Sequence, residues 1–114
     1  MARVLVAEVD GRLVGYALVK FGSHASPRSI STEVATLYVQ EHFARRGIGS
    51  LLLYAAQVEA QRRTGSAAVW LCVNAKNQEA IHFYQKLGFV QEGITYFELG
   101  GDKHENNVLV SKGA

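Results

Sequence analysis

The segment from 37 to 53, LYVQEHFARRGIGSLLL, constrains the fold more than any other part of the chain. Strand-like residues end at Val39, a short loop follows, and residues 47–49 (Gly-Ile-Gly) open a helix. The first turn of a helix has unpaired N–H groups and a partial positive charge, so it attracts an anion. Glycines there let phosphate oxygens approach the backbone, and Arg45 and Arg46 add positive charge. The segment therefore predicts a phosphate-binding loop between a strand and a helix.

Three other interpretations of this loop need to be weighed. A dinucleotide-binding loop requires a third glycine and an acidic residue ~20 positions later. Position 52, where the third glycine would stand, is Leu. A Walker A loop requires the pattern GxxxxGK[ST], which the sequence lacks. A plain helix start with solvated arginines fits the residues as well as a phosphate site of another kind does. From the residues of the loop alone, the plain helix start and a phosphate site of another kind both stay open.

Hydrophobic patterning predicts six strands and two helices in the order ββ-β-α-β-α-β-β, which indicates one mixed α/β domain over 1–114. Asp10-Gly11 is a strong hairpin signal between the first two strands. The polar stretches 22–31 and 100–107 are predicted loops. The expected strands are 4–9, 13–21, 34–39 (with Thr32 and Glu33 at its beginning), 67–73, 89–99 and 108–111.

The residues after Gly47 follow a helical period. Apolar side chains recur at i, i+3, i+4, i+7 and i+10, which predicts an amphipathic helix with one apolar stripe. Its members are Ile48, Leu51, Leu52, Ala55 and Val58. Arg62 and Arg63 suit the dipole in the last turn, and Gly65 is a typical helix end.

A second helix is expected after Asn77, whose side chain is a good N-cap. Lys86 and Gly88 would close it. Its apolar positions are Ala80, Ile81, Tyr84 and Leu87. The strand before it, 67–73, is a nearly unbroken apolar run, which is expected of a strand covered on both faces and makes Cys72 a buried small hydrophobe.

Two motifs resemble those of the GNAT acyltransferases. The loop before the first helix is similar to their coenzyme A pyrophosphate loop, Q/R-x-x-G-x-G/A, although Ala44 stands where Gln or Arg is usual. The segment 74–89, NAKNQEAIHFYQKLGF, is similar to their N-x-x-A-x-x-F-Y-x-x-x-G-F pattern. The resemblance covers nearly the whole chain. It implies a mixed, largely antiparallel sheet with splayed central strands and two main helices, the acyl-CoA N-acyltransferase fold.

The resemblance also implies an activity: an N-acetyltransferase that moves an acetyl group from acetyl-CoA to a primary amine by direct attack. The acceptor would be a small-molecule or peptide amine, and the cofactor would lie between the strand ending at Val39 and the one ending near Val73. The alternative is a catalytically inactive coenzyme A-binding or interaction module with the same fold. The expected cofactor-binding residues are Leu37, Tyr38, Val39, Arg45, Arg46, Gly47, Ile48, Gly49, Ser50, Asn77 and Ala80.

Two residues are expected to be catalytic by the same resemblance. Tyr84 matches the family's general acid, although an aromatic residue at helical spacing is also typical of a core. Glu33 lies where some members place a general base, and a partly apolar setting would raise its pKa toward neutrality. An exposed strand-edge glutamate, or water as the base, are the alternatives. The main-chain N–H of Tyr38 or Val39 would stabilise the tetrahedral intermediate.

Met1 falls where the family's second strand begins, so the usual first strand and two helices that commonly wall the acceptor site have no counterpart. The chain is then a short form or a fragment, or another subunit supplies that wall. A hydrophobic sheet face left uncovered predicts a homodimer.

Composition limits which ligands and cellular locations are expected. A net charge of +2 is too small to indicate nucleic-acid binding. One cysteine excludes an internal disulfide and suits the cytoplasm, and no apolar run approaches the ~18 residues of a membrane span. The histidines have no metal-ligand spacing, so no metal is expected. His24 and His104 are candidates for the acceptor pocket, with a plain surface position as the alternative.

Overall fold

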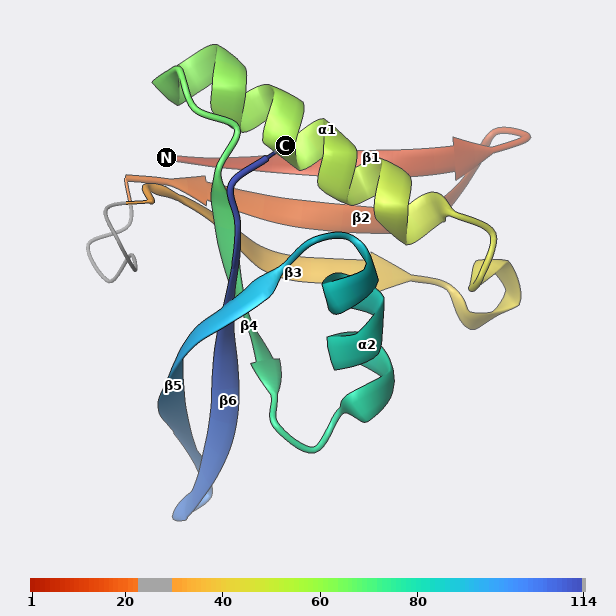
Figure 1. Ribbon diagram of the computed structural model, residues 1–114. Helices are drawn as coiled ribbons and strands as arrows, with labels where there is room; N and C mark the ends of the chain where they lie inside the picture. Colours follow the sequence, from red (N-terminus) through yellow and green to blue (C-terminus); the bar gives the residue numbers. More distant parts are fainter. Residues whose placement is uncertain (23–29, 114) are drawn as a thin grey trace.

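A computed structural model describes residues 1–22 and 30–113. Its elements follow the predicted order ββ-β-α-β-α-β-β (Figure 1). They are β1 (Ala2–Val9), β2 (Arg12–Phe21), β3 (Thr32–Val39), α1 (Ile48–Thr64), β4 (Val69–Asn74), α2 (Gln78–Lys86), β5 (Val90–Leu99) and β6 (Asp102–Ser111). A short 3₁₀ turn, Glu41–Phe43, links β3 to α1. Most of the predicted loop 22–31 lies outside the described residues.

The strands form one sheet in the order β1-β2-β3-β4-β6-β5. Four of the neighbouring pairs are antiparallel, and β3 and β4 are parallel. In the described part of the chain, β3 and β4 pair at a single position, Glu33 opposite Trp70, and then diverge (Figure 1). The predicted splayed sheet is therefore confirmed.

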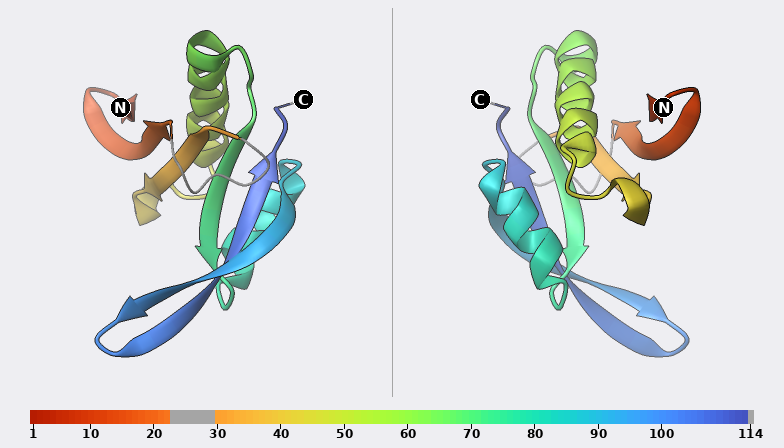
Figure 2. Two further views of the ribbon diagram at one scale, coloured as in Figure 1. Left: turned by 90° about the vertical axis from the view of Figure 1, so that its left-hand side faces the viewer. Right: turned by 90° about the vertical axis from the view of Figure 1, so that its right-hand side faces the viewer.

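One hydrophobic core lies between the two helices and one face of the sheet (Figure 2). Its side chains come from β2, β3, β4 and β6 and from both helices. The predicted cap of α2 is present, because the Asn77 side chain accepts a hydrogen bond from the Ala80 N–H at 3.1 Å. Gly65 ends α1 with a φ of 81°, as its position predicted. Cys72 is half-buried rather than fully buried.

The apolar stripe predicted for α1 is only partly buried. Leu51 is 67% exposed and Val58 is 43% exposed, whereas Leu53 and Ala56 are buried instead. The buried arc is therefore rotated away from the predicted stripe. Leu51 and Ala55 lie on the flank of α1 that faces β1, where the two elements line a hollow of about 530 Å³. Periodicity identifies the apolar face of a helix, but here that face is wider than the surface the sheet covers.

The predicted polar loop 100–107 is wrong, because β6 already begins at Asp102. The turn is limited to Gly100 and Gly101, which both have positive φ. Beyond it the pairing with β5 runs from Leu99–Asp102 to Val90–Val110. The outer part of this hairpin projects from the molecule (Figure 2). Polar side chains are tolerated on both of its faces, so the hydrophobic alternation that identifies a strand is missing.

Glu59 connects α1 to β1. Its carboxylate accepts hydrogen bonds from the side chains of Arg62 (2.8 Å) and Arg63 (3.3 Å), and it pairs with Arg3 of β1 at 3.5 Å. The guanidinium of Arg63 also lies over the Phe21 ring, 5.1 Å from its centroid. The Arg62 hydrogen bond, followed by the Arg63 bond and the nearby positive charges, lowers the pKa of Glu59 despite the opposing effect of burial.

We expect Glu59→Gln to lower the thermal unfolding temperature at pH 7. A carboxylate with a lowered folded-state pKa stabilises the fold above its unfolded pKa of about 4.5, and this stabilisation is lost as pH falls through the folded-state pKa. The gap between wild type and variant should therefore narrow in acid. Thermal melts across that range measure it, with Glu98→Gln on the projecting hairpin as the control. A gap that widens in acid would contradict this account.

Candidate functional site

The candidate site lies where β3 and β4 separate. A cavity of about 520 Å³ opens between the end of β3, the N-terminus of α1 and the start of α2. Eight of the eleven residues predicted to bind the cofactor line it: Leu37, Val39, Arg45, Gly47, Gly49, Ser50, Asn77 and Ala80. Segments far apart in the sequence thus meet at one hollow.

The N-terminus of α1 has the geometry of an anion site. Gly47 caps it with a φ of 81°, and the first helical hydrogen bond runs from the Leu51 N–H to the Gly47 carbonyl at 3.0 Å. The N–H groups of residues 48–50 therefore have no acceptor within the helix. Among the described residues, no side chain caps this end and no acidic residue lies in its first turn. The partial positive charge is thus not neutralised locally.

The two arginines beside this helix end differ in their surroundings. Arg45 has a left-handed backbone (φ 62°) and an exposed side chain that lies 3.9 Å from the exposed Glu79 carboxylate. A long ion pair between exposed groups contributes little, so an anion can replace Glu79 as its partner. Arg46 does not line the cavity, and its guanidinium lies 5.3 Å from the centroid of the Phe43 ring.

Gly49 has a packing role that the motif did not predict. A Cβ at this position would lie 3.1 Å from Cζ of Phe83, on α2, which is tighter than ordinary van der Waals contact. The glycine therefore lets the first turn of α1 approach α2 closely. Gly47 differs, since a Cβ there would meet nothing within 4 Å and its positive φ alone favours glycine.

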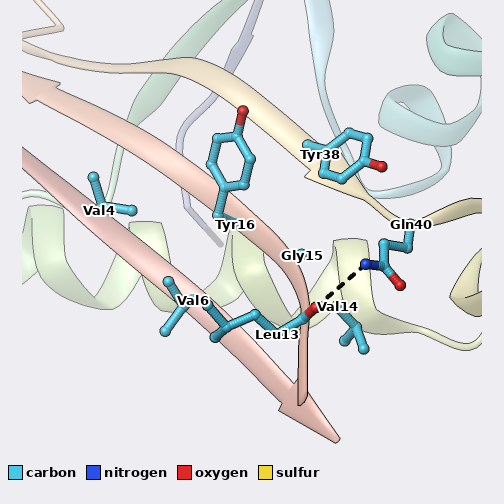
Figure 3. A pocket seen from close by; sticks show the side chains of 8 residues that line it. All are labelled: Val4, Val6, Leu13, Val14, Gly15, Tyr16, Tyr38 and Gln40. Atoms are coloured by element: carbon cyan, nitrogen blue, oxygen red, sulfur yellow. Dashed lines mark hydrogen bonds between the residues drawn. The ribbon is translucent and has the colours of Figure 1, made fainter.

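Two other predicted residues lie away from the cavity. The Ile48 side chain is buried in the core. The Tyr38 side chain points to the opposite face of the sheet, where its ring lies 5.7 Å from that of Tyr16 (Figure 3). Both tyrosines line a shallow apolar hollow of about 350 Å³ together with Val4, Val6, Leu13, Val14, Gly15 and Gln40. Only the backbone of Tyr38 is left to contact a ligand between the splayed strands.

Glu33 lies at the apex of the opening, opposite Trp70. It is half-buried, and this burial raises the pKa of its carboxyl group, while Lys20 opposite it on β2 acts weakly in the other direction. The pKa of the Cys72 thiol is raised as well, first by burial and then by the negative charge of Glu33. The apex therefore holds a carboxyl group whose affinity for a proton is increased.

Tyr84 is largely enclosed by aromatic side chains. Its ring lies 5.2 Å from that of Phe83 and 5.6 Å from that of Phe89, both at an angle of 60°. Burial raises the pKa of the Tyr84 hydroxyl, so the group keeps its proton at neutral pH. Tyr84 is next to the cavity-lining Phe83 but does not itself line the cavity.

The remaining predicted features fall elsewhere. His24 lies outside the described residues, and His104 is half-buried on β6, opposite Phe97 of the projecting hairpin. Within residues 1–22 and 30–113, no three His, Cys, Asp or Glu side chains are grouped to hold a metal ion. Neither helix in these ranges is long and apolar enough to cross a membrane.

Comparison with known proteins gives the family. The sequence matches the Acetyltransferase (GNAT) family over residues 2–89. It is 36% identical over 107 residues to an uncharacterized N-acetyltransferase of Mycobacterium tuberculosis, covering 94% of this chain but only 64% of that relative's length.

Solved structures agree with this match. The crystal structure of nourseothricin acetyltransferase has a TM-score of 0.81 and 27% identity, over 96% of this chain and 64% of that one. A GNAT family acetyltransferase from Elizabethkingia anophelis with acetyl-CoA bound has the same fold, with a TM-score of 0.75 and 18% identity over 97% and 76% of the two chains. Sequence, fold and motif positions agree, and the chain belongs to the GNAT acetyltransferase family.

Proposed function

We propose that this protein is an N-acetyltransferase that moves an acetyl group from acetyl-CoA to a primary amine. The observation that supports it most directly is the N-terminus of α1, whose unused N–H groups open into the cavity between the splayed strands. A coenzyme has a diphosphate and a long amide-bearing arm, so it needs both features at one place. The fold neighbour from Elizabethkingia anophelis carries acetyl-CoA, which agrees with this proposal.

The residues present suit each part of the coenzyme. The N–H groups of residues 48–50 and the cavity-lining Arg45 would hold the diphosphate by charge-assisted hydrogen bonds, and Arg46 would add positive charge nearby. The main chain of 37–39 would pair with the amides of the arm in the manner of an added strand. Asn77 and Ala80, at the start of α2, would form the opposite wall of the arm's channel.

The transfer itself needs three proton movements. An amine with a pKa near 10.4 is mostly protonated at neutral pH, and Glu33, directly or through water, would accept its first proton. The amine nitrogen then attacks the thioester carbonyl, so a C–N bond forms and the C–S bond breaks. Tyr84 would give its proton to the departing thiolate sulfur, and its phenolate would recover the second proton that the nitrogen loses, directly or through water. Free coenzyme A and the N-acetylated product are left.

The length of β3 limits how these roles combine. Glu33 and Tyr38 are five residues apart, which separates them by roughly 16 Å along a strand. One acetyl group cannot touch both, so the N–H of Tyr38 or Val39 suits the arm better than the tetrahedral intermediate. The register between β2 and β3 skips Ala35, a β-bulge that leaves its backbone unpaired two residues from Glu33. We place the stabilising N–H at this bulge.

The alternative is a coenzyme A-binding module without catalysis. One observation favours this alternative: Tyr84 does not line the cavity. Both proposals predict coenzyme binding, and they differ in whether thiol is released. A panel of amines with acetyl-CoA and a free-thiol assay therefore separates them.

The first test is calorimetric titration with acetyl-CoA, which requires no knowledge of the acceptor. We expect saturable binding by the wild type and binding weakened roughly tenfold or more by Arg46→Glu, which reverses a charge beside the diphosphate. Lys103→Glu makes the same change of charge at the tip of the β5–β6 hairpin and should have no effect. A folded wild type that does not bind would overturn the proposed function.

A further inference from the structure

Lys20 projects from the sheet beside the candidate base. It pairs with Glu33 across the antiparallel strands β2 and β3, and residues that lie directly opposite each other share one face of a sheet. The next pair along these strands, Val19 and Val34, points into the core. Because side chains alternate between faces, Lys20 and Glu33 both lie on the sheet face opposite the helices.

The interaction between these two side chains leaves the amine of Lys20 available. Burial raises the pKa of Glu33, and the positive charge of Lys20 lowers it in part. This effect is purely electrostatic, without hydrogen bonds like those that Arg62 and Arg63 give to Glu59. The Lys20 side chain is exposed. Its amine is therefore near the Glu33 carboxylate but is not held by it.

The Lys20 amine can reach the place where the proposed transfer would occur. Glu33 lies at the apex where β3 and β4 separate, and the bulge at Ala35 follows two residues later. Two residues advance a strand by roughly 7 Å, and neighbouring strands are about 4.8 Å apart. A lysine carries its ammonium on a flexible four-carbon stem, which is longer than the side chain of glutamate. A thioester carbonyl for which Glu33 can act as the base is thus also within range of Lys20.

Other nucleophiles of the chain are less well placed. Cys72 also lies near Glu33, but burial and then the charge of Glu33 raise the pKa of its thiol, so the reactive thiolate is scarce. Lys20 is the only lysine on β2, β3 or β4. The other lysines are Lys76 before α2, Lys86 at its end, Lys103 near the tip of the projecting hairpin and Lys112 after β6.

We propose that the protein acetylates its own Lys20. This inference rests on the proposed function, because it uses the same coenzyme and the same base. Glu33 accepts a proton from the Lys20 ammonium, and the nitrogen attacks the thioester carbonyl of acetyl-CoA, so a C–N bond forms and the C–S bond breaks. Tyr84 gives its proton to the thiolate sulfur, and its phenolate recovers the second proton that the nitrogen loses. The products are N-acetylated Lys20 and free coenzyme A.

Mass spectrometry of the protein incubated with acetyl-CoA, without any added amine, tests the proposal. The intact mass should rise by one acetyl group per chain, and peptide mapping should place that group on Lys20. Lys20→Arg should gain no acetyl group, whereas the matched control Lys103→Arg should gain one like the wild type. Glu33→Gln should slow the modification by roughly 100-fold, because it removes the base.

Two further comparisons separate a transfer within one chain from other routes. Gly49→Asp keeps Lys20 but should bind the coenzyme poorly, so it should stay unmodified at acetyl-CoA concentrations that modify the wild type. Lys20→Arg keeps the proposed site and can be mixed with Glu33→Gln, which keeps the lysine. The Lys20 of Glu33→Gln should react no faster in this mixture than alone. Thermal melts check that each variant is folded.

The proposal is overturned if Lys20 of the wild type gains no acetyl group, or if Lys103 gains as much as Lys20. It is also overturned if Glu33→Gln or Gly49→Asp reacts at the wild-type rate, or if mixing accelerates the reaction of Glu33→Gln. The calorimetric titration and the amine panel distinguish this failure from that of the proposed function. If acetyl-CoA binds and an added amine releases thiol while Lys20 stays unmodified, only self-acetylation is refuted.

Discussion

Replacing Gly49 with aspartate should weaken acetyl-CoA binding by roughly 100-fold, or about 2.7 kcal/mol, while the protein stays folded. The substitution puts a carboxylate at the α1 N-terminus, where it competes for the N–H groups of residues 48–50 and repels the diphosphate. The same carboxylate complements the helix dipole, which offsets part of the crowding that its Cβ causes against Phe83. Calorimetric titration gives the affinity and a thermal melt gives the stability. A large loss of affinity with little loss of stability would be hard to explain by misfolding.

Gly49→Ala is the control that the packing of this residue requires. Its Cβ would meet Cζ of Phe83 at 3.1 Å, so alanine reproduces the crowding between α1 and α2 without the charge. We expect the alanine variant to lose less affinity than the aspartate variant. If both variants lose the same affinity, close helix packing rather than anion binding explains the glycine. Unchanged binding in Gly49→Asp would remove the diphosphate from this helix end.

The order of elements was predictable because local signals agreed with one another. Asp10-Gly11 marks the β1–β2 turn, Asn77 caps α2 and Gly65 ends α1 at the expected positions. The projecting hairpin was not predictable, since the strand 102–111 has polar side chains over its first half. A strand buried on one face shows alternation, whereas an exposed two-stranded arm is held mainly by its partner strand.

The candidate site was predicted at the level of segments and less well at the level of contacts. The motif gave the positions of Gly47, Gly49 and Asn77, because a phosphate site needs backbone groups in a fixed order along the chain. It gave no sign that Gly49 packs on Phe83, 34 residues away, since such a contact depends on the angle between two helices. Alternation along a strand puts Tyr38 and Val39 on opposite faces, a distinction that the list of expected cofactor-binding residues did not make.

The apolar stripe of α1 shows a third limit of prediction from the sequence. Ile48, Leu52 and Val58 belong to one helical period, yet Ile48 and Leu52 are in the core while Val58 is exposed. The sequence reports that a side chain is apolar, and the number of strands beneath the helix decides whether it is covered. Four strands, β1 to β4, contact α1. The part of the stripe that extends past β1 stays exposed.

Tyr84→Phe should lower kcat by roughly 100-fold without changing the KM for acetyl-CoA. The change removes the proton that the thiolate sulfur would receive, while the ring keeps its contacts with Phe83 and Phe89. Because burial raises the pKa of Tyr84, the wild-type hydroxyl is protonated throughout the working range, and the loss should not depend on pH there. Steady-state kinetics with an accepted amine measure both constants. Tyr96→Phe, on the projecting hairpin, should leave them unchanged.

Glu33→Gln should also slow acetyl transfer, but the size of its effect should depend on pH. Wild-type kcat/KM should rise with pH through the pKa of Glu33, which burial places above 4.5, because only the carboxylate accepts a proton. The glutamine variant should be slower and should lack this rise. If kcat/KM of Tyr84→Phe is low but still rises with pH, and kcat/KM of Glu33→Gln is low without this rise, each residue carries out one proton transfer. If both variants turn over a genuine acceptor at the wild-type rate, catalysis rests on positioning alone, and neither side chain is a catalytic residue.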